Sequence, residues 1–384
     1  MTFSKRILIN AGNLTGVGAQ AGSGLSLIPP LLQAMSDCEI SLLLPDLATY
    51  HELEIPPNTM VNFVKCHSGF SNDFHRFDGL IRVIPQLARR RNVDVCLSLG
   101  DFAPMRMPCP NVIFFHQPLL LYENETHGLN GWPLYKRLFL TSYFAHSAGS
   151  AACVIVQTPV MADRLKKKFN IGDNRVAIVP YPTPRLEEIN AVAPILHPLI
   201  RECSKPQCLL FLAYYYPHKN HAILPKVAEE LRNRGMVNDV HIFTTISEDV
   251  FKSTRLKVEF ENYPDVITNL GHLSLAEVAG ALRSSNALFL PTLAESYGNI
   301  YLEAMNFRLP ILTSDRDFAR WMCRDFAIYF DPLDPVSIVD SIQAFPCFVT
   351  DKDAYCIAVG SHLQTFHKDW HEVALIYADI LRGV

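Results

Sequence analysis

The sequence has no long apolar run, no excess of one charge and no clustered cysteines. No window reaches about 18 consecutive apolar residues, and the N-terminal run is only Ile7-Leu8-Ile9, so the sequence predicts neither a transmembrane helix nor a signal peptide. With 34 basic and 38 acidic residues, the net charge of −4 argues against a nucleic-acid-binding protein. The ten cysteines include no Cys-x2-Cys pair, so we interpret them as reduced, mostly buried thiols of a cytoplasmic protein rather than as a disulfide framework or zinc site.

What the chain does have is enough apolar material for two domains. Its 384 residues are 49% hydrophobic and 19% charged, a composition typical of folded proteins, and two domains of about 190 residues fit this length. A proline-dotted, aperiodic stretch over 180–206 indicates the connection between them. We therefore predict an N-terminal domain over 1–185, a linker over 186–206 and a C-terminal domain over 207–364.

Short apolar runs alternate with longer helical patterns, which predicts an α/β fold with parallel sheets. Each run is apolar throughout, as expected for a strand covered on both faces. A capping box, Ser274 with Glu277, predicts the start of one helix. We expect the last segment, about 365–384, to cross back to the first domain. The predicted strands are 6–9, 40–44, 93–99, 112–115, 154–157 and 176–179 in the first half, and 208–213, 240–244, 266–270, 287–290, 311–314 and 328–330 in the second.

The stretch 291–305 is the most informative part of the sequence. Glu295 lies in the loop that leaves a predicted strand, Gly298 permits close backbone approach, and a helix begins near Asn299 with Glu303 in its first turns. A helix N-terminus offers free backbone N–H groups to a phosphate, and carboxylates accept hydrogen bonds from sugar hydroxyls. The alternative is that Glu303 only complements the helix dipole and that Glu295 belongs to a surface loop.

Glu295 and Glu303 form a Glu-x7-Glu motif, and with Gly298 the stretch resembles retaining glycosyltransferase family 4 (group 1). The resemblance extends over nearly all of 208–345. It implies the GT-B fold, in which two Rossmann-like domains face each other across a cleft and a C-terminal helix crosses back to the first domain. Further stretches that resemble the family are 309–314, 330–335 and 217–221.

The resemblance implies a retaining, metal-independent glycosyltransferase. Such an enzyme moves a hexose, of mannose or glucose type, from a nucleotide-diphosphate sugar to a glycan or lipid-linked acceptor, as in cell-surface polysaccharide or lipopolysaccharide synthesis. It needs no cofactor, because the nucleotide-sugar is the donor substrate. Two alternatives stay open: a nucleotide-sugar epimerase of the same fold, and a donor-binding pseudo-transferase without activity.

The family motif assigns roles to residues of the second half by similarity. Glu303 is expected to hold the ribose hydroxyls, Glu295 the transferred sugar and Lys219 the diphosphate. Backbone amides around Ser296, Tyr297, Gly298 and Asn299 are expected to complete the phosphate site.

One position departs from the family pattern. Members commonly carry an arginine five residues before the lysine, also on the diphosphate, and here that position is Tyr214. A cation that would stabilise the departing diphosphate is missing there.

Two further candidates lie in the first half. A glycine-rich loop over 12–24, with Gly16 and Gly18, resembles the family's loop that approaches the donor phosphates. His116 follows the predicted strand 112–115 at its carboxyl end, and family members often place a histidine there beside the sugar, so it is a candidate catalytic residue. The alternative is a structural histidine that is satisfied by hydrogen bonds.

The sequence predicts no metal site. The histidine pairs 218/221 and 367/371 have no third ligand nearby, and two Asp-x-Asp sequences, at 315–317 and 351–353, are interpreted as helix caps.

A stretch over 70–91 combines Phe70, Phe74 and Phe77 with five arginines, which suits an anionic membrane surface. The protein is therefore expected in the cytoplasm, peripherally on the inner face of the membrane. Equally, this stretch fits a solvated helix end with ordinary core aromatics.

Overall fold

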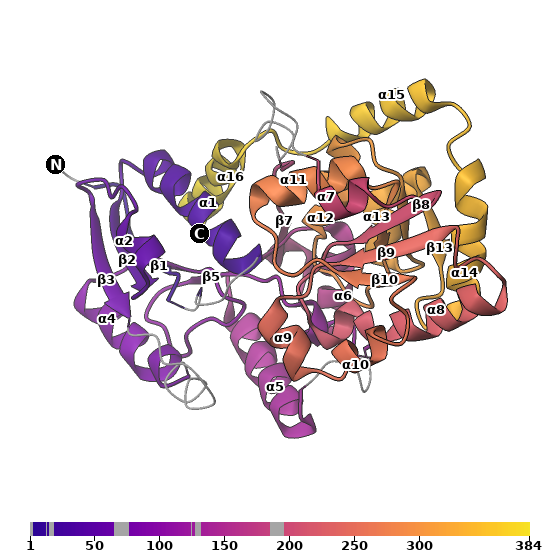
Figure 1. Cartoon of the computed structure of the whole chain (residues 1–384). Coiled ribbons are helices and arrows are strands. Elements are labelled where there is room, and N and C mark those ends of the chain that lie inside the picture. The colour runs from indigo at the N-terminus through magenta and orange to yellow at the C-terminus, as the bar shows by residue number, and fades with distance from the viewer. Residues whose placement is uncertain are drawn as a thin grey trace. The chain divides into compact units, whose positions relative to one another are not determined.

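The computed structural model describes residues 3–12, 14, 19–64, 77–123, 125–126, 132–184 and 196–384 (Figure 1). The chain divides into two compact units. The first comprises Met1–Leu121, Trp132–Pro182 and His367–Val384, and the second comprises Tyr122–Gly131 and Thr183–Phe366. Each unit is built around its own parallel sheet, so the predicted α/β class is confirmed.

The first unit contains a seven-stranded sheet in the order β3-β2-β1-β4-β5-β6-β7, with every pair parallel. Its strands are β1 (Arg6–Asn10), β2 (Glu39–Pro45), β3 (Thr59–Val64), β4 (Val95–Ser98), β5 (Asn111–Phe114), β6 (Cys153–Val156) and β7 (Val176–Ile178). Its α-helices are α1 (Ala19–Ala34), α2 (Ala48–His51), α4 (Ile84–Arg90), α5 (Leu134–Ser150), α6 (Pro159–Phe169) and α16 (Trp370–Gly383), with a π-helical turn (Gly79–Val83) before α4.

The C-terminal helix α16 belongs to the first unit, as predicted, although it follows the whole of the second unit in sequence. Arg382 binds the Asp37 carboxylate and the carbonyl oxygen of Ala34 at the end of α1, each at 2.8 Å. Lys5 in turn donates to the carbonyl oxygen of Arg382 at 2.8 Å. These contacts attach the last helix to the amino end of the chain.

The second unit contains a six-stranded parallel sheet in the order β10-β9-β8-β11-β12-β13. Its strands are β8 (Gln207–Phe211), β9 (Val240–Thr244), β10 (Ile267–Asn269), β11 (Ala287–Leu290), β12 (Ile311–Ser314) and β13 (Ala327–Phe330). Its α-helices are α7 (Pro198–Arg201), α8 (Leu224–Asn233), α9 (Glu248–Ser253), α10 (Leu256–Phe260), α11 (Leu275–Ser284), α12 (Asn299–Asn306), α13 (Asp317–Cys323), α14 (Pro335–Ala344) and α15 (Lys352–Leu363).

The predicted capping box opens α11. The Ser274 hydroxyl accepts a hydrogen bond from the Glu277 backbone N–H, and the Glu277 carboxylate accepts one from the Ser274 backbone N–H at 2.8 Å. Two donors that a helix start leaves unpaired are thereby satisfied.

Strand order fixes where ligands can bind in each unit. In both sheets the chain reverses its direction of strand addition once, between β1 and β4 in the first and between β8 and β11 in the second. Open parallel sheets bind ligands at the carboxyl ends of the strands beside such a reversal, because the loops there diverge. Among the described residues, no helix is long and apolar enough to cross a membrane.

Candidate functional site

Lys219 and Glu295 flank the reversal point of the second sheet. Lys219 lies in the loop after β8 and Glu295 in the loop after β11, and these two strands are direct neighbours. The Lys219 ammonium donates to Glu295 Oε1 at 2.5 Å, with side chains only 19% and 11% exposed. The structure therefore joins two of the predicted site residues into one largely buried ion pair. Glu295 is not part of an exposed surface loop.

Asn220 fixes the loops around this ion pair. Its backbone adopts a left-handed conformation with φ of 66°, which asparagine tolerates better than most residues. Its side-chain amide donates to the carbonyl oxygens of Pro291 (3.1 Å) and Pro332 (2.8 Å). One residue thus ties together the loops that follow β8, β11 and β13. In the sequence, Asn220 stands only within the stretch 217–221, and no local pattern predicts this bracing role.

The two histidines beside Lys219 are part of this support. His221 is buried and stacks on Phe211 with ring centroids 4.2 Å apart. Burial, with the nearby Lys219 charge, lowers the pKa of His218 and of His221 to about 3, so both rings are neutral. The described part of the chain contains no group of three or more His, Cys, Asp and Glu placed to hold a metal ion.

Gly298 shapes the entry to α12. Its φ of +82° is one that residues with a Cβ rarely adopt, and an added Cβ would lie 2.7 Å from the Tyr301 ring. That ring is fixed from its far end, where the Tyr301 hydroxyl and Thr313 Oγ1 are 2.8 Å apart. The helix therefore needs glycine at this position to begin close against the sheet.

Around Gly298, the groups that a ligand can contact are mainly backbone atoms rather than side chains. The Tyr297 side chain is 2% exposed and packs near Trp321 and Phe366, so only its backbone is available to a ligand. Asn299 is the first residue of α12, and its Oδ1 is buried without a hydrogen-bond partner among the described residues. Ser296, just before Tyr297, is partly buried. This geometry suits an anion held by the amides at a helix start.

Glu303 lies in the second turn of α12, beyond the first turn in which a carboxylate complements the helix dipole. Its side chain is partly buried, and no hydrogen-bond or ion-pair partner for it occurs in the described ranges. Burial raises the pKa of Glu303 to about 7. A carboxyl group held without a partner in such a place is poised to receive one from a ligand.

The structure also shows what stands at the position of the missing arginine. Tyr214 is 45% exposed and stacks against the ring of His272, with centroids 6.2 Å apart. No charge is supplied there.

A different arginine, Arg316, follows β12, the neighbour of β11. Its Nη1 donates to the carbonyl oxygen of Asp315, its Nη2 lies 4.0 Å from the Asp331 carboxylate, and its buried Nε has no hydrogen-bond partner within the described residues. Sequence reasoning missed Arg316 because it lies inside an Asp-x-Asp sequence interpreted as a cap.

That cap interpretation is right for one of the two Asp-x-Asp sequences and wrong for part of the other. Asp351 caps α15 by accepting a hydrogen bond from the Ala354 N–H at 3.0 Å. Asp315 does not cap α13. It pairs with Arg320 at 2.7 Å, and the hydrogen bonds from Arg320 lower the pKa of Asp315. The reason is position: the N-cap of α13 is Arg316, so Asp315 lies one residue before the place from which a side chain caps the helix.

The first unit brings His116 to the carboxyl end of β5, as predicted. Asp101, from the loop after β4, accepts a hydrogen bond from the His116 backbone N–H at 2.8 Å, and its carboxylate lies 3.3 Å from His116 Nδ1. Both side chains are buried, and the imidazole stacks on Phe114. Sequence reasoning missed Asp101, although an acidic residue just past a buried strand beside the sheet reversal is a signal that could have found it.

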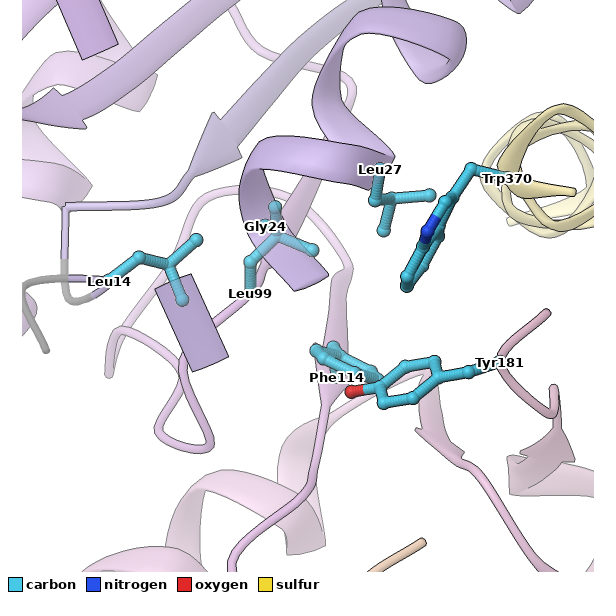
Figure 2. Close-up of a pocket in the computed structure, with 7 residues that line it drawn as sticks. All are labelled: Leu14, Gly24, Leu27, Leu99, Phe114, Tyr181 and Trp370. Atoms are coloured by element: carbon cyan, nitrogen blue, oxygen red, sulfur yellow. The ribbon is translucent and has the colours of Figure 1, made fainter. Parts of the chain in front are cut away.

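Gly16 and Gly18 lie outside the described residues. A small apolar pocket lies in the first unit (Figure 2), and its lining comes from α1, β5, the loops after β1, β4 and β7, and the start of α16. At Gly24 of α1, an added Cβ would displace the Leu14 side chain. The lining residues are Leu14, Gly24, Leu27, Leu99, Phe114, Tyr181 and Trp370.

Phe70, Phe74 and Arg76 of the predicted membrane stretch also lie outside the described residues. Phe77 is 8% exposed and packs in an aromatic cluster with Phe139 and Tyr143 of α5, with centroids 4.8 and 4.7 Å away. This phenylalanine is therefore part of the core.

Comparison with known proteins gives a family match over part of the chain. Residues 199–345 match the family model for glycosyl transferases group 1. No curated protein matches the sequence.

Solved structures share the whole fold at low identity. Sucrose-phosphate synthase from Thermosynechococcus elongatus is similar with a TM-score of 0.72 at 14% identity, covering 98% of each chain. Anabaena HepE, in complex with UDP, gives 0.66 at 13% identity over 99% of this chain and 100% of that one. WaaG, a glycosyltransferase involved in lipopolysaccharide biosynthesis, gives 0.63 at 14% identity over 99% and 100%. The GT-B fold and the expected enzyme class, a glycosyltransferase, are therefore confirmed.

Proposed function

We propose that this protein is a retaining, metal-independent glycosyltransferase that moves a hexose of mannose or glucose type from a nucleotide-diphosphate sugar to a glycan or lipid-linked acceptor. The observation that carries the proposal is the Lys219–Glu295 ion pair at the reversal point of the second sheet. The carboxyl group of Glu303 on α12, which has no partner among the described residues, supports it. The UDP bound to HepE supports a nucleotide donor, and the role of WaaG supports lipopolysaccharide or cell-surface polysaccharide synthesis as the setting.

The donor uses three kinds of contact in this proposal. Glu303 accepts hydrogen bonds from the ribose hydroxyls, and Glu295 accepts them from the transferred sugar. Lys219 has three N–H donors and uses one on Glu295, so it can bind the diphosphate without leaving its partner. The backbone amides of 296–299 at the start of α12 hold the phosphate oxygens.

Arg316 supplies the second cation that Tyr214 does not. Its ion pair with Asp331 is long at 4.0 Å, and its Nε is buried without a described partner, so the guanidinium has donors to spare for a phosphate oxygen. We assign the charge that the family places after β8 to this residue after β12.

Transfer then needs no nucleophile from the protein. As the bond to the sugar breaks, negative charge grows on the leaving diphosphate, where Lys219, Arg316 and the α12 amides stabilise it. The leaving oxygen takes the proton of the acceptor hydroxyl on the same face of the sugar, which retains the anomeric configuration. His116, oriented by Asp101, contributes a hydrogen bond beside the sugar.

The direct test is incubation with a panel of nucleotide-sugars. A donor at 100 times its dissociation constant should stabilise the protein against unfolding by roughly 2.7 kcal/mol. Product mass and anomeric configuration are then determined with the donor that protects. Nucleotide release that requires an acceptor supports transfer. Release without acceptor would instead indicate an epimerase, and protection without any release would indicate a pseudo-transferase.

Transfer should also persist in a metal chelator, because the proposed charge stabilisation comes from Lys219 and Arg316. Activity that is lost in EDTA and restored by manganese or magnesium would contradict the metal-independent mechanism.

The acceptor side of the proposal includes an anionic membrane surface, contacted from the cytoplasm by the first unit. The first turns of α5 expose Leu134, Tyr135, Leu138 and Phe139, each at least 50% accessible, and Lys136 and Arg137 lie between them. The 17 residues of α5 contain no acidic side chain. Exposed apolar side chains beside the partly buried basic ones suit the surface of an anionic bilayer, which combines hydrocarbon with negative charge.

A further inference from the structure

A second pocket lies at the opposite edge of the second sheet from Lys219 and Glu295. It is formed where β8 and β11 begin, and Asn286, the residue before β11, accepts a hydrogen bond from the Cys208 backbone N–H at 2.7 Å. The pocket has a volume of about 320 Å³. The proposed donor site uses the carboxyl ends of the same strands, so this pocket belongs to no part of it.

Two thiols share this pocket. Cys208 lies in β8 and is 4% exposed, and its Sγ donates to the carbonyl oxygen of Lys205 at 3.7 Å. Cys203, five residues earlier in the loop that enters β8, is partly exposed and lines the same pocket. Burial, together with a hydrogen bond to Cys203, raises the pKa of the Cys208 thiol to about 12. The two cysteines therefore line one pocket, Cys203 at a partly accessible position and Cys208 at a covered one.

The charged side chains that line the pocket are all basic. Arg201, Lys205 and Arg283 line it, and no acidic side chain is among its described lining residues. Lys205 is held in place because its ammonium donates to the carbonyl oxygens of Val237 at 2.6 Å and Val240 at 3.1 Å. Fixed positive charge around the pocket attracts an anionic reagent.

We propose that Cys203 and Cys208 form a redox-active dithiol that closes to an intramolecular disulfide by exchange with an anionic disulfide of the glutathione class. The Cys203 thiolate attacks one sulfur of glutathione disulfide, forms a mixed disulfide and releases one glutathione thiolate. Cys208 then gives up its proton to solvent and attacks the Cys203 sulfur, which releases the second glutathione thiolate. The two protein thiols are oxidised, glutathione disulfide is reduced to two glutathione molecules, and a reduced thiol pool reverses both steps.

The bond would connect the loop that enters β8 to the strand itself. Because Cys208 is fixed by the sheet through pairing with β9 and β11, Cys203 is the partner that moves. Because Cys203 is partly exposed, the disulfide is expected to be readily reduced rather than a permanent structural bond. The site is a reversible modification site and is independent of donor binding.

The experiment uses the full chain, first reduced and then equilibrated with defined ratios of reduced to oxidised glutathione. Remaining thiols are alkylated, and intact mass and peptide mapping follow. The wild-type protein should lose two hydrogens and two alkylation sites without retaining glutathione, and the map should join Cys203 to Cys208. Cys208→Ser should retain one glutathione on Cys203, and Cys203→Ser should leave Cys208 reduced. Cys347→Ser, which removes an exposed thiol elsewhere, should form the same 203–208 disulfide as the wild type.

A second measurement does not depend on redox potential. Phenylarsine oxide bridges two neighbouring thiols, so it should protect Cys203 and Cys208 together from alkylation in the reduced wild type and in neither single variant. A wild-type protein that retains glutathione stably on Cys203, or in which the arsenical protects neither thiol, would overturn the proposal. Circular dichroism of each variant checks that its fold is intact.

Discussion

The carboxyl edges of the two sheets differ in chemistry: one carries charged side chains and the other is mainly apolar. At the second sheet, Lys219 and Glu295 form a largely buried ion pair, and Asn220 ties three of the surrounding loops to one another. At the first sheet, the pocket after β1 and β4 is apolar, and the nearby polar feature is the buried pair of Asp101 and His116. The two units share a fold class but not the chemistry of their edges.

This difference follows from what each edge has to bind under the proposed function. A nucleotide diphosphate always carries the same negative charges, so fixed cations and helix amides are worth holding rigidly in place. An acceptor is uncharged at its reacting hydroxyl and otherwise variable, so apolar contact and one oriented imidazole suffice. The contrast predicts that substitutions at the second edge affect donor binding and turnover together, whereas those at the first edge affect turnover alone.

The largest effect is expected for Lys219→Met. Loss of a cation that faces the growing charge of the leaving group should reduce turnover by about 10² to 10³-fold and weaken donor binding. Steady-state kinetics and donor titration measure both. Lys226→Met, at an exposed position on α8, is the matched control and should behave as wild type. Because Lys219 covers Glu295, thermal unfolding must show that the variant is folded. Unchanged transfer by a folded Lys219→Met protein would contradict the proposal that Lys219 stabilises the leaving diphosphate.

The next effect is expected in the first unit. His116→Ala should reduce turnover by roughly 10²-fold, a typical contribution of a well-placed imidazole, while the donor dissociation constant stays within a factor of about two. Asp101→Asn should lower turnover less and shift its pH profile, because the amide no longer orients the ring as the carboxylate does. His146→Ala, at an exposed position on α5, serves as the control. Equal losses in donor binding and turnover for His116→Ala would erase the contrast between the two edges.

Sequence alone predicted the sheets well because buried parallel strands are apolar on both faces. Twelve runs were recognised in this way, and all correspond to strands. The strand β3 was missed because it lies at the sheet edge, where Thr59 and Asn62 interrupt the apolar run and Met60 and Phe63 are more than 40% exposed.

The site was predicted less completely, and the reason is again physical. Glu295, Glu303 and Lys219 stand in a recognisable motif. The roles of Asp101, Asn220 and Arg316 depend on contacts between loops that are distant in sequence, such as Asn220 with Pro332. No local pattern encodes which carbonyl oxygen a side chain will meet.

A smaller and pH-dependent effect is expected from Glu303. Its carboxyl pKa is raised from 4.5 to about 7 in the folded protein, so between those values the native state binds more protons than the unfolded state. Stability must therefore fall as pH rises from about 4.5 to about 7, by at most ~1.4 kcal/mol per pH unit. Denaturant unfolding at several pH values should show this slope, and Glu303→Gln should remove it.

Donor binding should show the opposite pH trend. The ionised carboxylate of Glu303 accepts ribose hydroxyls better than the neutral acid, so donor affinity should rise as pH increases through 7, by several-fold. The difference between wild type and Glu303→Gln isolates this contribution from the titration of the donor itself. An identical pH dependence in the two proteins would show that Glu303 does not meet the donor.

The smallest effect on turnover is expected from the start of α5, because no residue of this segment belongs to either of the two carboxyl edges compared above. Replacing Lys136 and Arg137 by serine should leave transfer to a water-soluble acceptor unchanged. Co-sedimentation with anionic vesicles should fall, because each basic residue near such a surface contributes about 1 kcal/mol, so losing two lowers partitioning by about thirtyfold at low salt.

Leu138→Ser should weaken the same binding through lost apolar contact, and added salt should weaken what remains of the electrostatic part. Ile357→Ser, which removes a 71% exposed apolar side chain from α15 of the second unit, controls for a general loss of surface hydrophobicity and should sediment as wild type. If neutral and anionic vesicles recover the wild-type protein equally, or if the α5 variants bind as the wild type does, α5 is an ordinary solvated helix. The lipid-linked acceptor would then have to reach the first unit without help from the bilayer surface.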